Sequence, residues 1–126
     1  MKVKDHRDLG FFKGRVAGGV VAMKGAYKFI TTEASGKVQF TLFIIMTIAG
    51  FYFKISREDW MFQFIAVAMV LSTEAMNTAV EKLCDFIHPD FHGRIGFIKD
   101  IAAGAVYFSA ICALVIGGFI YIPKFI

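Results

Sequence analysis

The stretch WMFQFIAVAMVLSTEAMNTAVEKLCD, residues 60–85, decides the fold, because its apolar run gives way to charged residues before it can cross a bilayer. The run is cleanly apolar only from Trp60 to Leu71, whereas a membrane-spanning helix needs about 20 predominantly apolar residues. The segment can span a membrane only if one helix continues through its acidic part to about Cys84. We therefore predict a membrane helix at about residues 59–84 that carries ionisable side chains.

The composition of the whole chain also indicates an integral membrane protein. Of the 126 residues, 57% are hydrophobic and 15 are phenylalanine, and the mean hydropathy is +0.62. Soluble domains are about 45–50% apolar, and a soluble fold of this size would leave too much apolar surface exposed. The length allows one domain, which we place at residues 1–126.

Two further segments are apolar enough to cross a bilayer. Residues 101–122 contain no charged side chain, and residues 38–53 become long enough when residues 34–37 are added. We predict spanning helices at about 34–53 and 97–122 in addition to the one at 59–84. Pro89 and Gly93 supply the turn between the last two helices.

The N-terminal part is basic and is predicted to be an amphipathic helix on the membrane surface. The first 37 residues hold eight Lys or Arg and three acids, which next to spanning helices marks the cytoplasmic side and gives no reason to expect a nucleic-acid partner. Apolar residues in a helix at about 6–30 form one stripe, with lysines on its flank. The stripe comprises Phe12, Val16, Gly19, Met23, Tyr27 and Ile30. A simple membrane anchor is the plainer explanation of this segment.

The acidic part of residues 60–85 has helical spacing. From Glu74, the polar positions Asn77, Thr78, Glu81 and Asp85 follow at i+3, i+4, i+7 and i+11, so they share one face within about 60°. Ionisable groups inside a span are costly and usually functional. A helix that simply emerges into water is an alternative that accounts for Asp85 and can extend to Glu81, but it explains Glu74 poorly, since the preceding apolar run is too short without it.

The acids suggest chemistry with a hard cation at the inner membrane surface. The three-span topology puts Glu33 and Asp100 near the same interface as Glu74 and Glu81. Carboxylates without His or Cys partners favour Mg²⁺. Together with basic residues at a membrane surface, they suggest phosphoryl transfer between water and lipid.

Other motifs give weaker signals. The SGKV at 35–38 lacks P-loop spacing, and no dinucleotide-binding glycine motif is present. We interpret His88 and His92 as structural or interfacial residues, and Cys84 and Cys112 as unpaired thiols.

Two quoted segments resemble a known family. EAMNTAVEKLCD (74–85) and HPDFHGRIGFIKDIAAGAV (88–106) closely resemble the small bacterial membrane lipid kinases of the prokaryotic diacylglycerol kinase and undecaprenol kinase family. Its hallmark, E-x-x-N-[ST]-A-[IV]-E-x-x-x-D, begins here at Glu74 and ends at Asp85, and the Lys99–Asp100 pair follows. With the N-terminal helix and Glu33, the resemblance covers nearly the whole chain.

The resemblance implies a phosphotransferase that uses ATP and Mg²⁺. Glu74 matches the base that takes the proton from the lipid hydroxyl, and Asn77 matches an amide that supports that site. Glu33 and Glu81 match the ligands of the metal that bridges the ATP phosphates. The positions that match nucleotide-binding residues are Arg15, Lys24, Gly25, Asp85, Gly96, Lys99 and Asp100.

The resemblance also implies an assembly and a location. Family members are homotrimers whose sites are shared between neighbouring protomers, in the bacterial plasma (inner) membrane, with the N-terminus and active site cytoplasmic. Gln39 stands where some members have an acid, which argues against a further metal ligand there. The AAGAV at 102–106 is closer to undecaprenol kinases.

The residues alone leave three functions open. A lipid kinase acting on diacylglycerol or undecaprenol accounts for the acids on one membrane side, and no lipid-binding residue is assigned. A small proton-coupled transporter would use Glu74 as its proton carrier, and it would need access from both sides. A non-catalytic membrane assembly subunit would tolerate replacement of both Glu74 and Glu81.

Overall fold

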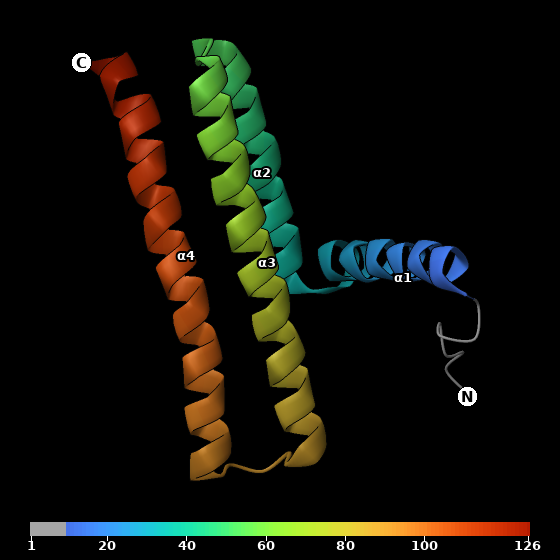
Figure 1. Cartoon of the computed structure of the whole chain (residues 1–126). Helices are drawn as coiled ribbons and strands as arrows, with labels where there is room; N and C mark the ends of the chain where they lie inside the picture. The colour runs from blue at the N-terminus through green and yellow to red at the C-terminus, as the bar shows by residue number, and fades with distance from the viewer. Residues whose placement is uncertain (1–9) are drawn as a thin grey trace.

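The chain is all helical over residues 10–126, the part that the structure describes. In this computed structural model the helices are α1 (Phe11–Thr32), α2 (Ala34–Phe53), α3 (Arg57–Ile87) and α4 (Gly93–Phe125) (Figure 1). The last three are long and apolar enough to cross a membrane. The predicted all-α membrane fold, with one helix preceding three spanning helices, is confirmed.

The helix bounds match the predicted ones at α2 and differ elsewhere at the ends. Both α3 and α4 begin before and end after the predicted 59–84 and 97–122. Local caps explain the early starts: the Ser56 hydroxyl accepts the Asp59 N–H at 3.1 Å, and the His92 ring accepts the Arg94 N–H at 3.1 Å. Of the predicted surface helix at 6–30, residues 6–9 lie outside the described part, and α1 continues to Thr32.

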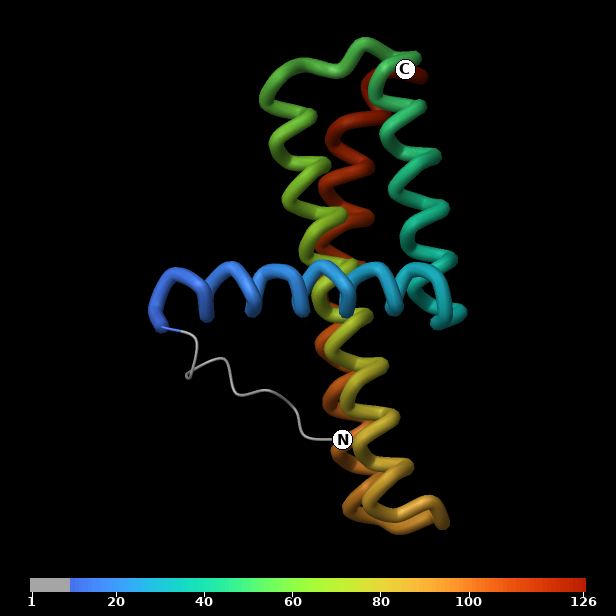
Figure 2. The backbone as a smooth tube through the Cα atoms, turned by 90° about the vertical axis from the view of Figure 1, so that its right-hand side faces the viewer, coloured from blue at the N-terminus to red at the C-terminus, as the bar shows by residue number. Residues whose placement is uncertain are grey.

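The three long helices form an antiparallel bundle, and α1 leaves it at a steep angle (Figures 1 and 2). By the rise of 1.5 Å per residue, α2 is about 30 Å long, α3 about 46 Å and α4 about 50 Å. A helix of about 30 Å matches the hydrocarbon thickness of a bilayer. The lower ends of α3 and α4 therefore project past the level at which α1 leaves the bundle (Figure 2).

This projection carries Asp100 beyond the level at which α2 begins. The 3.2 Å contact between the Ser35 and Thr78 hydroxyls sets the level at which α2 begins. The 2.6 Å ion pair between Lys99 and Asp85 lies seven residues further along α3, a rise of about 10 Å. Asp100, next to Lys99, is thus on the projecting part of α4 and not at the level where α2 begins.

The corner between α1 and α2 is a single residue wide. Glu33 has extended backbone, with φ −95° and ψ 137°, between two helical segments. Gly36 is buried directly behind it, and a Cβ added there would lie 2.0 Å from the Phe29 carbonyl oxygen. Glycine therefore allows the last turn of α1 to lie against the first turn of α2, and this contact fixes where the Glu33 side chain begins.

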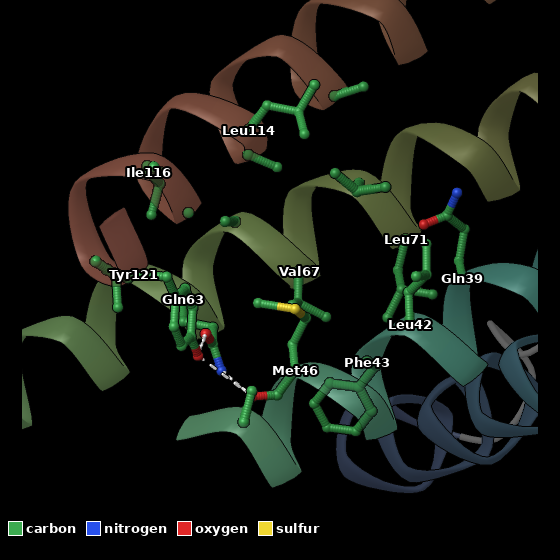
Figure 3. Close-up of a pocket in the computed structure, with 18 of the residues that line it drawn as sticks. Gln39, Leu42, Phe43, Met46, Gln63, Val67, Leu71, Leu114, Ile116 and Tyr121 are labelled. Carbon is green, nitrogen blue, oxygen red and sulfur yellow. Dashed lines mark hydrogen bonds between the residues drawn. The ribbon is translucent and has the colours of Figure 1, made fainter. Parts of the chain in front are cut away.

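A buried polar cluster joins α2, α3 and α4 towards the end of the bundle that is far from the α1–α2 corner (Figure 3). Gln63 of α3, only 7% exposed, donates from Nε2 to the Met46 carbonyl of α2 at 3.0 Å. The Tyr121 hydroxyl of α4 donates to Gln63 Oε1. These hydrogen bonds satisfy the Gln63 amide, which would be costly to bury without partners.

Tyr121→Phe is expected to lower the stability of the bundle by about 0.5–1.5 kcal/mol, because Gln63 Oε1 loses its donor. The measurement is the midpoint of SDS-induced unfolding in mixed micelles. Tyr107→Phe is the matched control, since Tyr107 is 65% exposed. Equal midpoints for the two variants would contradict a stabilising role of this cluster.

Candidate active site

The polar stripe on α3 faces α2 at Glu74 and Thr78 and faces water at Glu81. Glu74 Oε1 accepts a hydrogen bond from Gln39 Nε2 at 3.4 Å, and Thr78 contacts Ser35. Two turns further on, Glu81 is exposed, and its Oε1 accepts from Asn77 Nδ2 at 3.1 Å. The helix thus carries one carboxylate inside the bundle and a second about 10 Å further towards water.

The α1–α2 corner contributes a third carboxylate. Glu33 Oε1 lies 3.1 Å from Lys82 Nζ of α3, and the two side chains are 28% and 65% exposed. Lys82 follows Glu81 directly in sequence. The structure thus places Lys82, the residue after Glu81, beside Glu33, while Glu81 itself bonds Asn77.

The oxygen atoms of this region suit a hard cation. Within residues 10–126 no group of three or more His, Cys, Asp or Glu is close enough to form a complete metal cage. Mg²⁺ commonly takes one or two protein carboxylates and completes its shell with water and substrate phosphates. Asn77 Oδ1 is buried and has no hydrogen-bond partner within residues 10–126, so it leaves an unused oxygen beside Glu81. The donor set of Glu33, Glu81 and Asn77 fits Mg²⁺.

The projecting ends of α3 and α4 hold a separate charged pair. Lys99 Nζ donates to Asp85 Oδ1 at 2.6 Å. Gly96 lies one turn before Lys99 on α4, and Asp100 is exposed next to it. Four of the predicted nucleotide-binding residues therefore gather on one projection, about 6 Å beyond Glu81 along α3.

The two histidines of the α3–α4 turn have local roles, as the sequence suggested. The His88 ring is 2.7 Å from the Asp90 carbonyl oxygen, so its Nδ1–H donates there. His92 caps α4 through the Arg94 N–H. Both cysteines are unpaired. These residues shape the turn that carries the projecting charges.

The predicted nucleotide-binding residues of α1 are not brought to the carboxylates of their own chain. Lys24 and Arg15 are nine and eighteen residues from Glu33, which corresponds to about 13 Å and 27 Å along α1. Both are exposed, as is Gly25, where an added Cβ would meet nothing within 4 Å. The guanidinium of Arg15 lies over the Phe11 ring at 5.6 Å. The helix extends away from the bundle (Figure 1).

An apolar groove runs between α2, α3 and α4 and ends beside the stripe (Figure 3). Its volume is about 640 Å³, and its lining is almost entirely aliphatic and aromatic. Gln39 is the polar side chain at the Glu74 end, and Gln63 and Tyr121 lie at the other end. The groove thus ends at Gln39, the side chain that donates to Glu74 Oε1.

Three side chains of the site were assigned no function from the sequence. Gln39 and Ser35 contact the stripe, and Lys82 contacts Glu33. Helical spacing could have identified the first two, because positions 35 and 39 share a face of α2. Lys82 carries no such signal, because its partner Glu33 lies in the non-helical corner between α1 and α2.

Three helices long and apolar enough to cross a membrane, a carboxylate stripe and an apolar groove are the features expected of an integral membrane enzyme. The chain belongs to the prokaryotic diacylglycerol kinase family, whose profile matches residues 20–121. It is 33% identical over 126 residues to the undecaprenol kinase of Bacillus subtilis, covering 98% of this chain and 99% of that one. It is 38% identical over 56 residues to the diacylglycerol kinase of Synechocystis sp., covering 44% of this chain and 32% of that one.

The family membership selects among the three functions that the residues left open. The chain is a lipid kinase. A proton-coupled transporter and a non-catalytic assembly subunit are therefore set aside.

Proposed function

We propose that this kinase transfers the γ-phosphate of ATP to the hydroxyl of a membrane lipid, with Glu74 as general base. The observation that carries the proposal is the position of Glu74, which is half-buried on α3 and accepts a hydrogen bond from Gln39 at the end of an apolar groove. A lipid whose tail stays in the bilayer presents its hydroxyl at this boundary. A carboxylate there can accept the hydroxyl proton as the oxygen attacks the phosphate.

The residues around Glu74 position the reactants. Asn77 donates to Glu81 and so orients a carboxylate that, with Glu33, would hold Mg²⁺. When bound, the metal neutralises charge on the ATP phosphates, and transfer then depends mainly on alignment and electrostatics. Lys99 supplies positive charge from the projecting part of α4, where Asp85 holds it.

We infer that the nucleotide site is shared between copies of the chain in a homotrimer. Arg15, Lys24 and Gly25 lie too far from Glu33 within one chain to complete its site. Only four apolar side chains are buried among the described residues, so much apolar surface is left for lipid or neighbouring protomers. The residues proposed to bind ATP are Arg15, Lys24, Gly25, Asp85, Gly96, Lys99 and Asp100.

The proposed location is the bacterial plasma membrane, with α1 and the active site on the cytoplasmic side. The positive-inside rule supports this orientation, because α1 carries four basic residues. ATP is available on that side.

The proposed lipid is undecaprenol or diacylglycerol, the substrates for which the two relatives are named. The relative that matches over its whole length is the undecaprenol kinase, so we place undecaprenol first. The test is transfer of labelled γ-phosphate from ATP to a panel of lipid alcohols in detergent micelles, with and without Mg²⁺. Absence of transfer to every lipid would contradict the proposal.

Gln39→Met is expected to lower kcat about threefold to tenfold without raising KM for ATP. The thioether keeps the shape of the groove, but it cannot donate to Glu74 Oε1, so the carboxylate loses the bond that orients it. Steady-state kinetics with each substrate saturating measure the effect. Thr47→Val is the control, since the Thr47 hydroxyl bonds only the Phe43 carbonyl of its own helix. A kcat equal to that of the control would show that Gln39 does not position Glu74.

A further inference from the structure

Lys82 is the cation beside the proposed metal ligands, and nothing in the family motif assigns it a role. It occupies an unspecified position between Glu81 and Asp85 of that motif. Its ammonium lies 3.1 Å from Glu33 Oε1, across the junction between α3 and the α1–α2 corner. A divalent cation that binds Glu33 Oε1 must therefore replace or rearrange this ion pair.

The exposure of the pair makes such a replacement easy. The Lys82 side chain is 65% exposed and that of Glu33 is 28% exposed. Ion pairs of this kind stabilise a fold only weakly, because water and salt screen the attraction. A divalent cation carries twice the charge of the ammonium and coordinates the carboxylate oxygen directly. Lys82 thus neutralises Glu33 without holding it irreversibly.

We propose that Lys82 is a phosphate-binding residue that rests on Glu33 in the metal-free protein and moves to the ATP phosphates when a divalent cation takes the carboxylate. The inference rests on the proposed function, which puts the metal and the triphosphate at Glu33 and Glu81. The released ammonium is on a long flexible side chain and sits one residue from Glu81. Lysine serves as a mobile point charge for phosphate oxygens.

The exchange keeps charge balanced at each stage. Without ligands, the ammonium compensates the carboxylate of Glu33. With both ligands bound, the cation compensates the carboxylates and the ammonium compensates phosphate charge. A purely structural ion pair between α3 and the corner predicts a different pattern, namely lower stability on removal of Lys82 and no tightening of metal binding.

The test uses the full chain in detergent micelles and compares Lys82→Met with Lys82→Arg. Mn²⁺ binding without ATP is measured from the EPR signal of the unbound ion, and KM for ATP is measured with saturating lipid and Mg²⁺. For Lys82→Met we expect a dissociation constant for Mn²⁺ about twofold to fivefold lower, since the competing cation is gone. We expect KM for ATP to rise about threefold to tenfold, while Lys82→Arg stays close to the wild type in both measurements.

The opposite signs of the two effects separate the possible outcomes. Lys124→Met removes one exposed lysine at the far end of α4 and should change neither value. Unchanged or weaker Mn²⁺ binding by Lys82→Met overturns the competition, and an unchanged KM overturns the move to phosphate. If the wild type itself shows no saturable Mn²⁺ binding, the metal site of the proposed function is wrong, and this inference fails with it.

Discussion

Glu74→Gln is expected to lower kcat for lipid phosphorylation by about two to four orders of magnitude, the usual contribution of a positioned general base. Glutamine has the same shape and can still pair with Gln39, but it cannot accept the proton of the lipid hydroxyl. Binding of ATP should be unchanged, because Glu74 lies about 10 Å along α3 from Glu81. The measurements are labelled phosphate transfer and the dissociation constant of a non-hydrolysable ATP analogue.

The matched control is Glu58→Gln. Glu58 is an exposed carboxylate in the first turn of the same helix, at the opposite membrane face. Its replacement changes the charge by the same amount and should leave kcat unchanged. Normal turnover of Glu74→Gln would remove Glu74 from the role of base, and weakened ATP binding would move it into the nucleotide site.

Gly36→Ala is expected to have the second largest effect, a loss of at least about tenfold in activity with a drop in stability of about 1–3 kcal/mol. The added methyl group would lie 2.0 Å from the Phe29 carbonyl oxygen and 2.7 Å from its carbonyl carbon. Both are backbone atoms, so relief requires that α1 move away from α2. The movement would also shift Glu33 relative to α3.

The control for this variant is Gly104→Ala in α4, where an added Cβ meets nothing within 4 Å. Alanine at such a helical position should be neutral or mildly stabilising, because it lowers the backbone entropy of the unfolded chain. Activity and the midpoint of SDS unfolding are compared for both variants. Full activity in Gly36→Ala would mean that the close α1–α2 contact is not required for the site.

The sequence predicted the helices well because their signals are local. Apolar length identified α2 and α4, and the i+3, i+4 and i+7 spacing after Glu74 showed that α3 continues through its acidic part. The early starts of α3 and α4 depend on caps by Ser56 and His92. A count of apolar residues does not include such caps, so the predicted bounds were too short.

The site was predicted in part, and the missing part is tertiary. Helical spacing placed Glu74 and Glu81 on one face and the resemblance gave them roles, but neither indicated that Gln39 contacts Glu74 or that Lys82 contacts Glu33. The position of Asp100 on the projecting part of α4 follows from interhelical contacts and not from distance along the chain. The roles assigned to the catalytic, metal and nucleotide residues remain predictions.

One helix, α3, carries three of the proposed functional residues. The proposed proton acceptor, metal ligand and nucleotide contact stand at Glu74, Glu81 and Asp85 of one uninterrupted helix, separated by about 10 Å and 6 Å. The geometry of one helix therefore sets the spacing of all three residues. Tilting or sliding of α3 in membranes of different thickness would move these three residues together and keep their spacing, but it would change their positions relative to Glu33 on the α1–α2 corner.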